Sequence, residues 1–239
     1  MKTYGLIGYP LSHSFSKNYF SQKFSQLGIE AKYENFEIKS ISELSDIVKN
    51  HKLSGLNVTI PYKQKVLEYI QVLSPEAKEI GAVNTIKIEG EKLIGYNTDY
   101  IGFTKSIQPL LTTEHKAALV LGNGGATKAI IYALNKLNIS SSIVARNNGN
   151  YTFKEVDENI VKQHQIIINC TPLGTYPSIE KKPPFPYKFL TSKHLLYDLV
   201  YNPSETAFLK MGMEKNCSTK NGMEMLEIQA EEAWKIWNS

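Results

Sequence analysis

A glycine-rich turn carries the clearest chemical signal in the sequence. The stretch LVLGNGGATKA, residues 119–129, directly follows an apolar strand and opens a long helix. Gly122 allows a tight turn, while Gly124 and Gly125 let backbone amides approach a pyrophosphate at the positive end of the helix. A short glycine cluster is weak evidence alone, because a bare turn also uses glycine for a positive φ. The strand, turn and helix context favours a dinucleotide site.

The strand after the glycine turn ends in a cation. An enzyme that prefers NAD places Asp or Glu about 20 residues beyond the glycines, where the carboxylate binds the ribose 2′-hydroxyl. Here the strand SSIVAR ends in Arg146, whose guanidinium can pair with the 2′-phosphate of NADP. A solvated charge at a strand end is the alternative, and the residue alone does not decide.

A lysine after a broken strand is the candidate for proton transfer. In NVTIPYK, residues 57–63, the pattern is that of a strand until Pro61 ends its ladder of hydrogen bonds. Lys63 follows where a new helix, containing Val66, Leu67 and Ile70, is expected. Lys63 is therefore either a solvated surface charge or a catalytic group.

Alternating strands and helices must position these residues. Before residue 99 the order is strand, helix, strand, helix, strand, which predicts a mainly parallel sheet, followed by a hairpin around Glu89-Gly90-Glu91. The first helix has Phe20, Phe24 and Leu27 on one face and ends at Gly28. A second alternation contains the expected strands KAALVLG, SSIVAR, QIIINC and HLLYDLV. We expect the domain boundary near residues 99–102.

Composition excludes several classes of function. The 239 residues carry a net charge of +4 without a basic run, so neither nucleic acid nor a membrane is an expected partner. Cys170 and Cys217 have no metal-binding spacing, and no metal is expected. The N-terminal apolar run is too short for a signal peptide, so the chain is predicted to be cytoplasmic.

Eight stretches in this order and spacing resemble the shikimate dehydrogenase family along nearly the whole chain. They are SHSFS (12–16), NVTIPYK (57–63), GAVNT (81–85), YNTDYIGF (96–103), GNGGATKA (122–129), NCTPLGT (169–175), YDLVYNP (197–203) and NGMEMLEIQA (221–230). The resemblance implies an α/β fold of two domains with a cleft between them. A substrate-binding domain, 1–101 plus 223–239, would have a mainly parallel sheet, and 102–222 would be a Rossmann-like NADP-binding domain.

The resemblance also implies the reaction and the residues that serve it. The reaction is the reversible NADPH-dependent reduction of 3-dehydroshikimate to shikimate, in the pathway to chorismate and the aromatic amino acids. The partners would be this small-molecule substrate and NADP, with the protein a monomer or a homodimer. The implied substrate-binding residues are Ser14, Ser16, Asn57, Thr59, Lys63, Asn84, Asp99, Tyr201 and Gln229. The implied cofactor-binding residues are Gly122, Asn123, Gly124, Gly125, Ala126, Arg146, Thr171, Leu199 and Gly222.

Within this set, Lys63 and Asp99 are the implied catalytic pair. Alcohol oxidation needs a group that takes the hydroxyl proton, yet lysine, with a reference pKa of about 10.4, is normally protonated. The start of a helix at Pro61 and partial desolvation would disfavour the ammonium, whereas the Asp99 carboxylate would stabilise it. We therefore expect Lys63 to be the principal acid/base, oriented by Asp99, with the two groups titrating as a unit.

The sequence departs from the family pattern at three positions. Lys17 stands where the family usually has proline, and Asn123 replaces the usual alanine. Asn150 stands about where a second basic residue is common, which predicts a weaker preference for NADP over NAD. Two other functions remain open: a quinate or shikimate dehydrogenase that uses NAD, and a non-catalytic ligand-sensing protein. The second predicts the loss of Lys63 or Asp99, and both are present.

Overall fold

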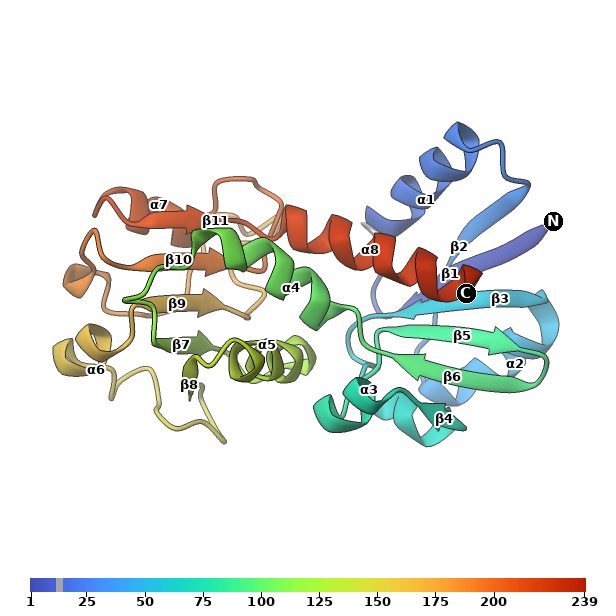
Figure 1. The fold of residues 1–239 in the computed structure, drawn as a ribbon, viewed down its shortest axis with the longest axis horizontal. Helices are drawn as coiled ribbons and strands as arrows, with labels where there is room; N and C mark the ends of the chain where they lie inside the picture. Colours follow the sequence, from blue (N-terminus) through green and yellow to red (C-terminus); the bar gives the residue numbers. More distant parts are fainter. Residues whose placement is uncertain (12–14) are drawn as a thin grey trace. The chain divides into compact units, whose positions relative to one another are not determined.

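The computed structural model describes residues 1–11 and 15–239, which form two compact units (Figure 1). The first unit contains Met1–Thr98 and Ala230–Ser239, and the second contains Asp99–Gln229. No helix in the described part of the chain is long and apolar enough to cross a membrane. Each unit has its own sheet and its own core.

The first unit is built on a mixed sheet of six strands in the order β2-β1-β3-β5-β6-β4. Its strands are β1 (Lys2–Gly8), β2 (Ala31–Glu37), β3 (Leu53–Val58), β4 (Val72–Leu73), β5 (Thr85–Glu89) and β6 (Lys92–Tyr96). The strand β1 pairs in parallel with β2 and β3, whereas β5 pairs antiparallel with β3 and β6. Gly90, at φ 62°, forms the predicted turn between β5 and β6.

Helices cover both faces of this sheet. They are α1 (Phe15–Gln26), α2 (Leu44–His51), α3 (Pro75–Ile80), the 3₁₀ helices η1 (Ile41–Glu43) and η2 (Lys65–Tyr69), and the end of α8 (Met223–Asn238). In the core cluster between this sheet and the helices α1 and α8, Phe20 and Phe24 of α1 pack with Trp237 of α8. The Trp237 indole donates a hydrogen bond to the Ile86 carbonyl at 3.0 Å. It lies so close to Gly55 that any side chain there would collide with it.

Two local predictions for this unit are wrong. The helix expected from Pro61 does not form, because residues 61–64 make turns before η2, and the buried Tyr62 instead donates to the Ile38 carbonyl at 2.7 Å. The expected effect of a helix N-terminus on Lys63 is therefore wrong too. Leu27 is 56% exposed rather than buried, since α1 ends at Gln26 before Gly28 turns the chain at φ 62°.

The second unit has a five-stranded parallel sheet in the order β11-β10-β9-β7-β8. Its strands are β7 (Ala117–Leu121), β8 (Ser140–Val144), β9 (Ile166–Asn169), β10 (Leu195–Asp198) and β11 (Ser218–Lys220). Its helices are α4 (Asp99–Ile107), η3 (Gln108–Leu110), α5 (Gly125–Lys136), α6 (Glu158–Gln163), η4 (Tyr187–Phe189) and α7 (Ala207–Met213). The strand β7 lies between β8 and β9 in the sheet, so the chain passes from β8 on one side of β7 to β9 on its other side. A topological switch point, where open α/β sheets bind ligands, therefore lies at the carboxyl ends of β7 and β9.

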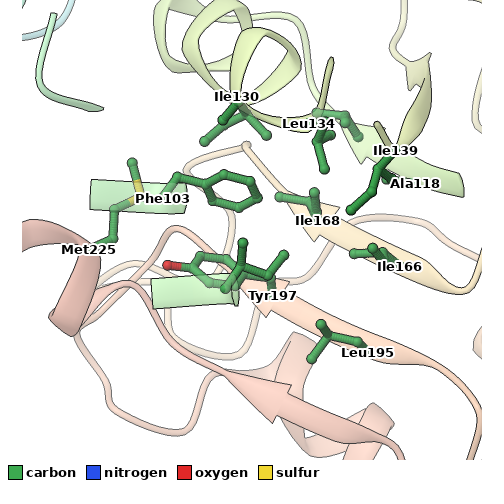
Figure 2. Packing of buried hydrophobic residues seen from close by; sticks show 13 residues of the cluster. Phe103, Ala118, Ile130, Leu134, Ile139, Ile166, Ile168, Leu195, Tyr197 and Met225 are labelled. Carbon is green, nitrogen blue, oxygen red and sulfur yellow. The ribbon is translucent and has the colours of Figure 1, made fainter. Parts of the chain in front are cut away.

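Alternate residues of these strands build separate cores on the two faces of the sheet. Ile168 and Tyr197 face α4 and α5, where Figure 2 shows Phe103 beside Tyr197. The centroids of these two rings are 5.0 Å apart. The Tyr197 hydroxyl is satisfied by Ser106 at 2.6 Å. On the other face, Ile167 packs in a cluster that also contains residues of α6 and α7. Both faces are covered, as a parallel sheet requires.

Candidate functional site

A chain of neutral hydrogen bonds joins several predicted site residues of the first unit. The Tyr33 hydroxyl, which lies near the Ser16 side chain, donates to the Asn57 side-chain oxygen at 2.7 Å. The Asn57 amide in turn donates to the Asn84 carbonyl and to the Thr85 hydroxyl, both at 3.3 Å. Burial raises the pKa of Tyr33, so its hydroxyl keeps its proton and remains a donor. Ser14 lies outside the described residues.

Asn84 is the centre of this arrangement. It is 3% exposed, and its side-chain oxygen accepts from the Thr98 backbone N–H at 2.7 Å. Its side-chain amide donates to the Thr98 hydroxyl at 3.0 Å. Asn84 therefore ties the segment before β5 to the residues after β6.

Thr59 and Lys63 follow β3 in a tightly fixed segment. The Thr59 N–H donates to the Ile7 carbonyl at 2.9 Å, and its methyl group lies where a side chain at Gly8 would be. The Lys63 carbonyl accepts from the Val83 N–H at 2.8 Å. Backbone bonds to β1 and to the segment before β5, rather than a helix, therefore place these two residues.

The glycine turn of the second unit lies at the switch point, between β7 and α5. Gly122 has φ 106°, and a β-carbon there would lie 3.0 Å from the Thr171 methyl group, so only glycine fits. The Gly124 N–H is already bonded to the Thr127 hydroxyl at 3.1 Å. Within the described residues, the amides of Gly125 and Ala126 have no acceptor. A β-carbon at Gly124 would meet nothing within 4 Å. The turn thus fits a phosphate at its open side.

A buried carboxylate holds the neighbouring strand ends. Asp198 is fully buried at the end of β10, where it accepts hydrogen bonds from the Asn169 side chain at 2.9 Å and the Thr206 hydroxyl at 2.6 Å. The Val200 N–H donates to it at 2.9 Å. Burial raises the pKa of the Asp198 carboxyl to about 6, although its three donors lower it. The Asn169 side-chain oxygen also accepts from the Thr171 hydroxyl at 2.6 Å.

This network sets the backbone around the predicted nicotinamide residues. The Leu199 N–H donates to the Asn169 carbonyl at 3.0 Å, and the Gly222 N–H to the Val200 carbonyl at 3.2 Å. Gly222 lies so close to the Leu199 carbonyl that a side chain would not fit there. The structure therefore brings Thr171, Leu199 and Gly222 together around the ends of β9 and β10.

The remaining predicted residues of this unit lie at its margins. Arg146 is exposed, two residues after β8, and takes part in none of the ion pairs found within the described ranges. Asp99 begins α4 and is 1% exposed, and Gln229 lies in α8. Burial raises the pKa of Tyr201. In residues 1–11 and 15–239, no three metal-ligating side chains are grouped to hold an ion.

The sequence reasoning missed Tyr33, Asn169 and Asp198. The sequence did contain a signal for Asp198. A carboxylate inside an apolar run such as HLLYDLV must either reach solvent at the end or edge of a strand, or be buried with hydrogen-bond partners. The amide and hydroxyl residues gave no such signal, because their partners are distant in sequence.

A parallel sheet with a glycine turn at its switch point and a cation after the next strand defines the second unit as a Rossmann-like fold. A model of the shikimate dehydrogenase substrate binding domain matches residues 6–86. The chain is also 41% identical to Shikimate dehydrogenase (NADP(+)) of Clostridium beijerinckii, over 99% of this chain and 92% of that protein. The protein therefore belongs to the shikimate dehydrogenase family.

Solved structures agree with this assignment and with the predicted two-domain α/β fold. Shikimate dehydrogenase from Aquifex aeolicus is 36% identical, with a TM-score of 0.88, covering 100% of this chain and 92% of that one. Shikimate 5-dehydrogenase from Thermus thermophilus, in complex with NADP(H) and shikimate, is 27% identical with a TM-score of 0.87. That match covers 99% of this chain and 93% of the Thermus chain.

Proposed function

We propose that the protein is an NADP-dependent shikimate dehydrogenase that reversibly reduces 3-dehydroshikimate to shikimate. The observation that carries the proposal is its 41% identity, over 99% of its length, to an enzyme of that name. The fixed Lys63 segment of the first unit and the open glycine turn of the second support it. We assign substrate binding to the predicted domain 1–101 plus 223–239, and cofactor binding to 102–222.

The second unit would hold NADP along the carboxyl ends of its strands. The free amides of Gly125 and Ala126 would bind the pyrophosphate, with Asn123 beside them and Arg146 at the 2′-phosphate. Thr171, Leu199 and Gly222 would form the nicotinamide subsite. When bound, NADPH supplies the hydride for the reduction.

Lys63 would serve as the acid/base. During reduction its ammonium donates a proton to the oxygen as the carbonyl becomes a hydroxyl, and during oxidation its neutral amine takes that proton back. Asp99 would orient the reacting hydroxyl.

The other polar residues would position the substrate. Asn84 and Gln229 would bind its ring hydroxyls, with Asn57 beside Asn84. Its carboxylate would be held by Ser14, Ser16, Thr59 and Tyr201. Burial keeps the pKa of Tyr201 high, so its phenol remains a donor. We further propose that the protein acts in the cytoplasm as a monomer or a homodimer.

Four assay mixtures test this function. Shikimate and quinate are each offered with NADP⁺ and NAD⁺, and reduction is followed at the nicotinamide absorbance band. We expect the highest catalytic efficiency with shikimate and NADP⁺. A higher efficiency with quinate and NAD⁺ would favour a quinate dehydrogenase, and no reduction in any mixture would favour a ligand sensor.

The same assay measures cofactor preference. Residues 146–150 contain one cation, Arg146, and the Asn150 side-chain oxygen accepts from the Ile143 N–H at 2.8 Å. A single charge-assisted contact contributes roughly 1.5–3 kcal/mol. We expect an NADP preference below the family norm, and a comparable efficiency with both cofactors would show that the second cation matters.

A further inference from the structure

Arg146 is the only arginine in the whole chain. Of 27 basic residues, the other 26 are lysines. The two side chains are not interchangeable, because a guanidinium offers a planar fork of donors that matches two phosphate oxygens, whereas an ammonium is a point charge. The fork is effective only if its backbone is held at the correct place, so what holds the loop that carries Arg146 matters for recognition.

This loop, residues 146–150, is closed at its base and is called here the arginine loop. The Ala145 N–H donates to the Tyr151 carbonyl at 3.0 Å, and Asn150 exchanges two bonds with Ile143, through its backbone N–H at 2.9 Å and its side-chain oxygen at 2.8 Å. The backbone at Gly149 lies so close to β8 that a β-carbon there would be 2.9 Å from the Ile143 carbonyl oxygen. These contacts fix the base of the loop to β8.

A single side chain fixes the tip of the arginine loop to the glycine turn. The Asn123 side-chain amide donates to the Asn148 carbonyl at 2.9 Å. Asn123 belongs to the turn that would hold the pyrophosphate, and Asn148 lies two residues beyond Arg146. An alanine at position 123 could not make this bond.

We propose that Asn123 is a positioning residue that clasps the arginine loop to the glycine turn, so that Arg146 is held ready for the 2′-phosphate of the cofactor. This inference rests on the proposed use of NADP. Its physical basis is preorganisation: a loop already fixed in its binding position loses less freedom when the ligand binds. Asn123 therefore strengthens binding of the 2′-phosphate through Arg146, and it does not change the affinity for the parts of the cofactor that NADP and NAD share.

Direct binding to two half-cofactors tests the clasp. Adenosine 2′,5′-bisphosphate carries the 2′-phosphate and AMP lacks it, and calorimetric titration gives the affinity of the intact protein for each. We expect Asn123→Ala to bind the bisphosphate about 3- to 10-fold more weakly, the effect of one hydrogen bond, with AMP affinity unchanged. Arg146→Ala should weaken the bisphosphate about 10- to 100-fold. The matched control is Asn135→Ala, an exposed asparagine of α5, which should change neither affinity.

The double variant decides whether Asn123 works through the arginine. If it does, adding Asn123→Ala to Arg146→Ala weakens the bisphosphate no further. The proposal is overturned if the two losses multiply, if Asn123→Ala weakens both half-cofactors equally, or if it weakens neither. If the wild-type protein is active with NADP⁺ and Asn123→Ala binds the bisphosphate as tightly as wild type, the role of Asn123 is overturned but the NADP assignment stands. If the wild-type protein binds AMP as tightly as the bisphosphate or more tightly, the NADP assignment is overturned as well.

Discussion

The two units hold their polar residues in opposite ways. In the first, Tyr33, Asn57 and Asn84 are joined through hydroxyl, amide and backbone groups, all of them neutral. In the second, Asn169 and Thr206 surround the fully buried carboxylate of Asp198. Both networks lie where strands end, and both place residues of the proposed site.

The difference concerns pH. A network of amides and hydroxyls keeps the same donors and acceptors from acidic to weakly alkaline solution, as long as its tyrosine stays protonated. Asp198, whose pKa burial raises to about 6, gains a proton just below neutrality, so one of its two acceptor oxygens becomes a donor. The proposed substrate residues should therefore be insensitive to mild acid, whereas the strand ends beside the proposed nicotinamide subsite should respond.

The largest expected effect separates the units by function. Lys63→Ala should reduce turnover roughly 10²- to 10⁴-fold, with a much smaller change in the Michaelis constant, because it removes the proposed acid/base of the first unit. Binding of NADP⁺, measured by calorimetry, should not change. Lys65→Ala, an exposed lysine of η2, is the control. Near-normal turnover in Lys63→Ala would end the assignment.

The next effect compares the two networks in stability. Asn169→Ala removes a donor from Asp198 and an acceptor from Thr171, both inside the second unit, and should lower the free energy of unfolding by about 3 kcal/mol or more. Tyr33→Phe removes one neutral bond to Asn57 and should cost about 1–2 kcal/mol. Urea unfolding followed by circular dichroism measures both. An equal or larger cost for Tyr33→Phe would contradict the comparison.

A third prediction tests the buried charge through pH. Because the Asp198 pKa rises from 3.8 to about 6 on folding, the folded state binds a proton more tightly, and wild-type stability falls as pH rises from 4 through 6. Asp198→Asn has no charge to bury, so its stability relative to wild type should increase by about 2–3 kcal/mol across that window. Denaturant midpoints at pH 4, 5, 6 and 7 measure this slope, and a flat difference would show that folding does not raise the Asp198 pKa.

The smallest effect has the opposite sign. Burial lowers the pKa of His115 below 6.5, more than the nearby Glu114 carboxylate raises it. The unfolded chain therefore takes up the proton first, and stability present above pH 6.5 is lost as pH falls through the lower pKa of the folded state. His115→Gln should flatten the stability curve below pH 6.5, whereas His51→Gln, exposed on α2, should leave it unchanged. Equal slopes for the His115 variant and wild type would exclude this contribution.

Most of the fold could be predicted from the sequence, because most helices and strands have a long apolar pattern or one with clear turn residues at its ends. The glycine turn, α5 and the parallel strands follow from apolar runs bounded by glycine, and the hairpin follows from Gly90. The helix after Pro61 failed because Val66, Leu67 and Ile70 span only five residues, which is too short to distinguish an α-helix from the 3₁₀ helix that forms. The short elements α7 and β11 were not predicted either.

The site was predictable only in part. Its residue types came from the family resemblance, and their roles stay predictions. The supporting contacts could not be read from the chain, since Tyr33 meets Asn57 across 24 positions and Asn169 meets Asp198 across 29. Asn123 was expected to bind the cofactor and was noted as a departure from the family. Its bond to Asn148 was not predicted, because the two residues become adjacent only when the arginine loop folds back.

Trp237 also affects the order in which the protein can be completed during synthesis. Its indole fills the space over Gly55 and bonds to Ile86, so residues made after the second unit belong to the core of the first unit. The second unit is one continuous segment, and all its strands precede residue 221. On the ribosome, the unit whose synthesis begins first is therefore the one whose core is completed last.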